Sequence, residues 1–143
     1  MLEEFTLFDV DCSGIRLHGR IGGSGAPLLL LHGHPQSHVM WHRVAPTLAR
    51  HFTVVMMDLR GYGDSGRPDP DTGHVAHSKR EMARDAVAVM AHHGFETFQL
   101  LAHDRGARVA HRLAADHPAA VERMMLLDIA PTLAMYDNTS DAF

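Results

Sequence analysis

Residues 100–112, LLAHDRGARVAHR, decide the fold because a short apolar run passes directly into an amphipathic helical pattern. Within it, AHDRG at residues 102–106 has the spacing small-x-nucleophile-x-small, typical of a sharp strand-to-helix turn usually built around a serine. That turn forces its central residue to a positive φ, so the neighbouring residues have to be small. Here the central residue is Asp104, which raises the question of what chemistry needs a carboxylate there. Aspartate is also a common N-cap, so an ordinary capped helix stays open as an alternative.

Strands and helices are predicted to alternate on both sides of this turn. Strand and helix alternation indicates βαβ units in a mainly parallel sheet, with function at the carboxyl ends of the strands. The sequence therefore predicts an α/β fold. The expected strands are 5–10, 15–21, 27–31, 53–57, 98–101 and 121–127, and the expected helices are about 41–50, the segment from the Ser78 cap to Gly94, and 105–116.

Composition limits the class of protein. The chain has 143 residues, 45% apolar and 21% charged, which suits one soluble domain. A net charge of −4 gives no basic field for nucleic acid. The longest apolar runs are too short to span a bilayer, and the N-terminus lacks the pattern of a signal peptide. The single cysteine, Cys12, excludes an intrachain disulfide. We therefore expect a cytoplasmic protein with no membrane or nucleic-acid partner.

Two groups near the turn favour a function for Asp104. The segment HGHP at residues 32–35 follows a predicted strand, where the backbone N–H of His34 can join that of Arg105 in an oxyanion hole. Arg105 and Arg108 share one face of the first helical turn, and two guanidiniums at a helix N-terminus suit a small carboxylate or phosphate. The alternative for the pair is two surface arginines.

Other acidic and histidine residues have competing interpretations. Asp128 ends the strand after the helix and can orient a catalytic histidine, but it also suits a turn ahead of Pro131. His103 is expected to face away from the site, since neighbouring strand residues point to opposite faces. The remaining histidines show no closed ligand set, so surface or packing roles are favoured and no metal is expected.

The segment GYGDSG at residues 61–66 matches the glycine pattern of dinucleotide-binding proteins. That kind of site needs a helix to begin at the glycines, whereas RPDP follows here. We therefore expect a turn at this position and no nucleotide cofactor.

Four segments together resemble a known family. LLHGHPQSHVMWHRVAP (30–46), DLRGYGDSGRP (58–68), AHDRGARVAHRLAADHP (102–118) and LLDIAPT (126–132) are similar to the α/β-hydrolase fold, specifically the haloacetate (fluoroacetate) dehalogenases. The resemblance implies Asp104 as nucleophile, Arg105 and Arg108 as ligands of the substrate carboxylate, and Asp128 as the acid of the catalytic triad. Ala102 and Ala107 depart from the glycines usual in that family.

The resemblance covers nearly the whole chain but only the N-terminal half of such an enzyme. It implies that residues 1–143 form the N-terminal part of a single α/β-hydrolase domain, truncated before the cap domain and the C-terminal strands. The catalytic histidine and the cap are then expected after Phe143, so turnover by this chain is expected to be incomplete.

Chemistry explains why an aspartate suits the turn. A serine that attacked a saturated carbon would leave an ether, whereas an aspartate leaves an ester that activated water can hydrolyse. A carboxylate is already ionised at neutral pH, so the displacement needs no general base. Asp104 therefore predicts substitution at an sp³ carbon, and the arginines predict an anionic group beside it. The expected reaction converts a haloacetate and water to glycolate and halide, without a cofactor.

Two other functions stay open. An epoxide hydrolase shares the aspartate nucleophile and the H-G-x-P loop, but it usually has tryptophan where Arg105 stands and needs cap tyrosines. A non-catalytic anion-binding fragment or pseudo-enzyme would keep the pocket without turnover. The strand at 121–127 is expected to be an unpaired edge, which predicts self-association or a homodimer.

Overall fold

The computed structural model describes residues 2–70 and 72–137. Its strands are β1 (Thr6–Cys12), β2 (Ile15–Gly23), β3 (Ala26–Leu31), β4 (Phe52–Met57), β5 (Phe98–His103) and β6 (Val121–Leu127). Its helices are the 3₁₀ segments η1 (His38–Arg43) and η2 (Val75–His77) and the α-helices α1 (Ala45–Leu48), α2 (Lys79–His92), α3 (Arg105–Asp116) and α4 (Thr132–Asp137). Phe143, after which the resemblance places the cap and the catalytic histidine, lies outside the described residues.

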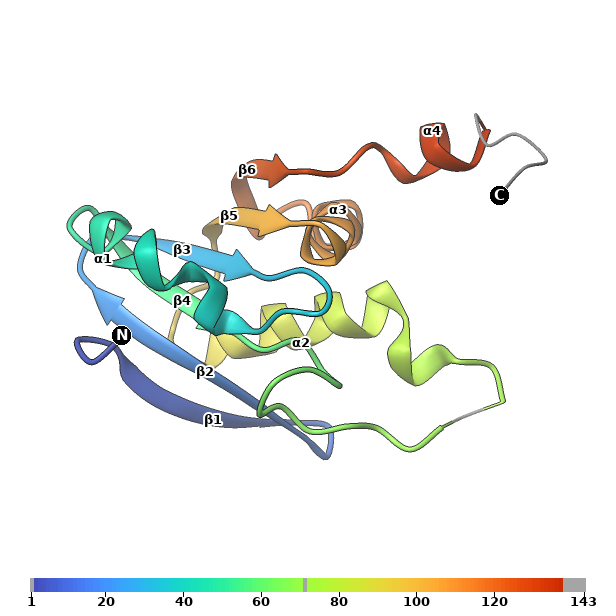
Figure 1. Ribbon diagram of the computed structural model, residues 1–143, viewed down its shortest axis with the longest axis horizontal. Coiled ribbons are helices and arrows are strands. Elements are labelled where there is room, and N and C mark those ends of the chain that lie inside the picture. The colour runs from blue at the N-terminus through green and yellow to red at the C-terminus, as the bar shows by residue number, and fades with distance from the viewer. Residues whose placement is uncertain (1, 71, 138–143) are drawn as a thin grey trace.

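The six strands form one sheet in the order β1-β2-β4-β3-β5-β6 (Figure 1). β1 and β2 form an antiparallel hairpin, β2 is antiparallel to β4, and the strands from β4 to β6 are parallel. Leu31 pairs with Ala102, so β3 and β5 end side by side. This register brings the loop after β3 to the turn after β5, as the predicted parallel sheet requires.

Helices cover both faces of the sheet, as Figure 1 shows. α2 and α3 pack on one face, where their apolar side chains meet those of the strands in the larger core. η1 and α1 cover the other face with Trp41 and Ala45, against Leu28, Leu30 and Met56. Successive residues of the central strands β3 and β4 therefore enter different cores, which explains their continuous apolar sequence.

The sequence predicted the strands to within a few residues and α3 with its observed limits. The helix expected over 41–50 is wrong as a single element, because the chain forms η1 and then the short α1. Pro46 lies in the first turn of α1 and has no backbone N–H, so a helix cannot continue through it with full hydrogen bonding. α4 was not expected. Within the described residues, no helix is both long and apolar enough to cross a membrane.

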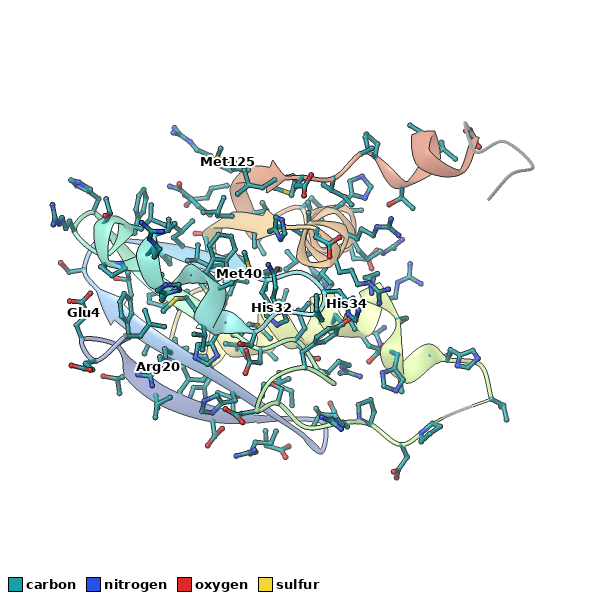
Figure 2. The ribbon with its side chains drawn as sticks, in the orientation of Figure 1. Glu4, Arg20, His32, His34, Met40 and Met125 are labelled. Carbon is teal, nitrogen blue, oxygen red and sulfur yellow. The ribbon has the colours of Figure 1, made fainter. Side chains whose placement is uncertain are left out.

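β6 lies at the edge of the sheet, where among the described residues it pairs with β5 alone. Met125 is 60% exposed on this strand (Figure 2). Exposed apolar edges can pair with other chains, so we propose that residues 1–143, prepared as an isolated chain, self-associate. Light scattering should show particles larger than a monomer, and Met125→Lys should shift them toward the monomer. A monodisperse monomer of the unsubstituted chain would contradict this expectation.

Candidate active site

Asp104 occupies the turn that joins β5 to α3. Its φ of 49° and ψ of −117° define a backbone conformation that a non-glycine residue rarely adopts. Holding a residue in such a strained conformation costs about 1–3 kcal/mol. Its backbone carbonyl accepts hydrogen bonds from the N–H groups of Ala107 and Arg108, which begin the helix. The Asp104 side chain makes no N-cap hydrogen bond, which would come from the N–H of the second or third residue of α3. The simple N-cap alternative therefore does not describe this residue.

The Asp104 carboxylate faces the loop that leaves β3. Its Oδ1 accepts a hydrogen bond from the His34 backbone N–H at 2.8 Å, and Figure 2 shows His34 in this loop. Burial alone would raise the pKa of Asp104, but hydrogen bonds from the backbone N–H groups of His34 and Arg105, with the charges of His103 and Arg105, lower it below its usual value. The structure thus brings both predicted donors to a carboxylate that stays ionised at neutral pH.

Two glycines allow this close approach of β3 and the turn. A Cβ at Gly33 would lie 2.6 Å from the Asp104 Cβ and 2.8 Å from its Oδ1. A Cβ at Gly106 would lie 2.5 Å from the Leu31 carbonyl oxygen. Real Cβ atoms do not approach other atoms so closely, so both positions require glycine. The small residue expected two positions after Asp104 is Gly106, and the contact between α3 and β3 explains why it has to be small.

A cleft of about 500 Å³ opens above the turn, and it is lined by His34, Lys79, Asp104, Arg105 and Arg108. Both arginines predicted to bind an anion therefore reach the cleft that Asp104 also lines. Lys79 was not singled out from the sequence, although the predicted Ser78 cap placed it at the start of a helix. The structure bears out that cap, since the Ser78 Oγ accepts a hydrogen bond from the Glu81 N–H at 3.2 Å.

Tyr62 lies outside this cleft but contacts two of the residues that line it. Arg105 Nη1 donates to the Tyr62 hydroxyl oxygen at 3.4 Å, and this oxygen lies 3.3 Å from His34 Nδ1. Tyr62 belongs to residues 61–66, which form turns rather than a helix, as expected from the sequence. This segment therefore contributes a phenol group beside the site.

Asp128 follows β6 with a φ of 52°. Its Oδ2 lies 3.6 Å from Nε2 of His103, whose Nδ1 is 3.2 Å from Gln36 Oε1. His103 does not line the cleft above Asp104, in keeping with the expectation that it faces away from the site, and its ring lies between Gln36 and Asp128. Within the described residues, the histidine that Asp128 contacts is His103.

The other histidines near the site have structural contacts. His32 is buried, and its Nε2 accepts a hydrogen bond from the Leu59 N–H at 3.0 Å, while burial lowers its pKa. His38 is also buried, with its Nδ1 2.9 Å from Asp58. In the part of the chain that the structure describes, no group of histidine, cysteine and acidic side chains could hold a metal ion.

Comparisons with known proteins identify the family of the chain and the share of each relative that it covers. A family model described as alpha/beta hydrolase fold matches residues 26–142. The chain is 48% identical over 138 residues to a fluoroacetate dehalogenase of Burkholderia sp, covering 96% of this chain and 45% of that protein. It is 41% identical over 133 residues to a soluble epoxide hydrolase of Corynebacterium sp. (strain C12), covering 93% of this chain and 45% of that protein. The chain therefore spans about half the length of these relatives.

One solved structure shares the same architecture. It is that of a protein from Nostoc sp PCC 7120, assigned provisionally as an alpha/beta hydrolase, with a TM-score of 0.96 and 56% sequence identity. The likeness covers 99% of this chain and 48% of that chain. Both the sequence and the structural comparisons thus match the N-terminal half of longer proteins.

Proposed function

Because the chain belongs to the alpha/beta hydrolase fold family, we propose that its site cleaves the carbon–halogen bond of short 2-haloacids through an ester at Asp104. The observation that carries this proposal is the ionised Asp104 carboxylate, held by the His34 N–H in a cleft that Arg105 and Arg108 also line. The similarity to a fluoroacetate dehalogenase supports the same substrate class. The activity proposed is that of the whole protein.

In the first step, an Asp104 carboxylate oxygen attacks the α-carbon of the haloacid. A C–O bond forms, the carbon–halogen bond breaks, and the halide leaves with the bonding electrons, so no proton moves. Arg105 and Arg108 bind the substrate carboxylate and hold the α-carbon near the nucleophile. Positioning of this kind contributes several kcal/mol to lowering a barrier in favourable cases.

In the second step, water attacks the ester carbonyl of Asp104 and glycolate leaves. The developing oxyanion takes the place of the carboxylate oxygen, where the N–H groups of His34 and Arg105 already donate. The attacking water gives one proton to a base, for which the resemblance implies a histidine after Phe143. When the bond between the Asp104 carbonyl carbon and the glycolate oxygen breaks, that oxygen takes the second proton of the water and the Asp104 carboxylate is restored. We propose Asp128 as the acid that orients this histidine.

An epoxide hydrolase is the second candidate, and Tyr62 is the observation that favours it. Its hydroxyl lies beside Arg105 and His34, where it can give a proton to the oxygen of an epoxide that Asp104 opens. The relative from Corynebacterium sp. supports this candidate. Its substrate would carry a carboxylate for the two arginines, as glycidate does.

Halide release separates these functions from simple anion binding. The protein is incubated with bromoacetate, and bromide is measured against protein concentration. Cys12 and the histidines also release bromide when they are alkylated, so peptide mass spectrometry locates the carboxymethyl group. Up to one bromide per chain matched by carboxymethylation of Asp104 indicates that the ester forms and persists, and release that continues beyond all carboxymethylated sites indicates that a base is also present. Glycidate consumption without bromide release would favour the epoxide hydrolase, and calorimetric binding of glycolate without either reaction would leave an anion-binding module.

The pH dependence of Asp104 alkylation follows from its lowered pKa. Because the carboxylate is the reactive form and its pKa is below the usual value near 3.9, the alkylation rate should be constant between about pH 5 and pH 8. Burial raises the pKa of Cys12 to about 11, so its alkylation should rise about tenfold per pH unit over the same range. Quantitative peptide mass spectrometry with bromoacetate measures both sites. A rate at Asp104 that follows a histidine pKa near 6.5 would contradict the direct displacement.

A further inference from the structure

A second cleft adjoins the one above Asp104. It has a volume of about 460 Å³ and shares the side chains of His34, Lys79 and Arg105 with the first. Its other lining residues include Arg67 and His77, and they include no aspartate or glutamate. Lys79 and Arg105 therefore stand where the two clefts meet, and the second cleft offers positive charge without a competing carboxylate.

The charges around Asp104 are unbalanced for a substrate with one carboxylate. The first cleft holds one acidic side chain, Asp104, against Lys79, Arg105 and Arg108. Two guanidiniums already match one substrate carboxylate. Binding of a monoanion would thus leave an excess of positive charge, and a second anionic group on the ligand would neutralise it.

The Lys79 ammonium has a weak partner in the protein. Its Nζ contacts the sulfur of Met82 at 3.6 Å, and within the described ranges no carboxylate forms an ion pair with it. Burial, together with the charges of Arg105 and Arg108, lowers the pKa of Lys79 below its usual value. A bound anion would stabilise the charged ammonium and raise the pKa of Lys79 again. This side chain is therefore suited to bind an anionic ligand.

We propose that Lys79 forms a second anion subsite, which makes dianionic 2-haloacids such as 2-halosuccinates substrates of this cleft. The inference rests on the proposed function of Asp104. Arg105 and Arg108 bind the carboxylate on the reacting carbon, and Lys79 binds the second carboxylate. Asp104 displaces the halide from the α-carbon as before, with a C–O bond formed and the halide leaving with its electron pair.

The test compares two reagents that react at equally substituted carbons. 2-Bromosuccinate carries two carboxylates, and 2-bromopropionate carries one. The ratio of their rates of Asp104 ester formation should fall about tenfold in Lys79→Met, because a charge-assisted hydrogen bond is lost. Lys79→Arg should keep most of the ratio. Arg80→Met is the matched control: Arg80 follows Lys79 but pairs with Asp116 at 2.9 Å outside both clefts, so its loss should leave the ratio unchanged.

Lys79 also permits a direct readout, since it is the only lysine of the sequence. Reductive methylation with ¹³C-formaldehyde keeps its charge and gives one side-chain NMR signal, with the N-terminal amine as internal control. Succinate should raise the pKa of the labelled Lys79 more than acetate does, and should leave the N-terminal amine unchanged.

The outcomes separate this inference from the proposed function. If Asp104 is alkylated but Lys79→Met leaves the rate ratio unchanged, the second subsite is overturned and the proposed reaction stands. If neither reagent alkylates Asp104 while succinate raises the pKa of Lys79, the proposed reaction fails and the anion subsite stands. A Lys79 pKa that does not respond to succinate overturns the subsite as well.

Discussion

Replacing Asp85 with alanine is expected to lower the free energy of unfolding by about 3–5 kcal/mol. Arg60 donates from Nε and Nη2 to the two carboxylate oxygens of Asp85, each at 2.6 Å. The side chains are only 6% and 3% exposed, and hydrogen bonding to Asp85 raises the pKa of Arg60. Asp85→Ala therefore leaves the charge of Arg60 buried without a counterion. Removing one partner of a buried pair destabilises a protein more than replacing both partners with apolar residues.

The matched control is Asp9→Ala. Asp9 pairs with Arg16 at 3.5 Å, with about half of each side chain exposed, and its Oδ1 lies 2.9 Å from His18 Nδ1. Exposed pairs contribute about 0–1 kcal/mol, so the loss is expected to stay well below that of Asp85→Ala. Urea unfolding of the three proteins gives the comparison. If both variants lost the same free energy of unfolding, the buried Arg60–Asp85 pair would not stabilise the fold more than an exposed pair does. The pair matters for the site because Asp85 lies on α2, which also carries Lys79.

Asp104→Asn is expected to abolish ester formation, with a loss of at least about 100-fold in alkylation at this position. An amide lacks the negative charge that attacks carbon, while its oxygen can still accept from the His34 N–H, and asparagine tolerates a positive φ. The fold should therefore survive, which circular dichroism can check. Asp9→Asn, on an exposed strand, should retain full reactivity at Asp104. Bromide release by Asp104→Asn beyond the amount that carboxymethylation of Cys12 and the histidines accounts for would place the nucleophile elsewhere.

Arg108→Ala is expected to weaken rather than abolish the same reaction, by about tenfold, because Arg105 remains to bind the carboxylate. The measurement is the concentration dependence of alkylation by bromoacetate, where the variant should need more reagent. An unchanged dependence would contradict a role for Arg108 in substrate binding.

The parts of the site that the sequence predicted depend on local rules. The turn around Asp104 needs small neighbours and begins a helix, so its position could be inferred from residues 102–106 alone. The His34 N–H could be placed because parallel strands end at the same edge of a sheet. These features recur whenever the same backbone path is followed, and they do not depend on distant side chains.

The parts that the sequence missed depend on tertiary packing. Lys79 shows no periodic pattern, and its approach to Asp104 follows from the way that α2 packs beside α3. The contact of His103 with Asp128 follows from the pairing of β5 with β6, which places Leu127 beside His103. Tyr62 lies in a turn segment whose position is fixed by hydrogen bonds from the His38 and Asp64 N–H groups to the Asp58 carboxylate.

Peptide mass spectrometry after incubation with bromoacetate tests the nucleophilic role of Asp104 most directly. The account predicts a carboxymethyl ester on Asp104 that hydroxylamine removes, beside a stable thioether on whatever fraction of Cys12 reacts. Modification confined to Cys12 and the histidines, with Asp104 unmodified in a folded protein that has released no glycolate, would contradict it.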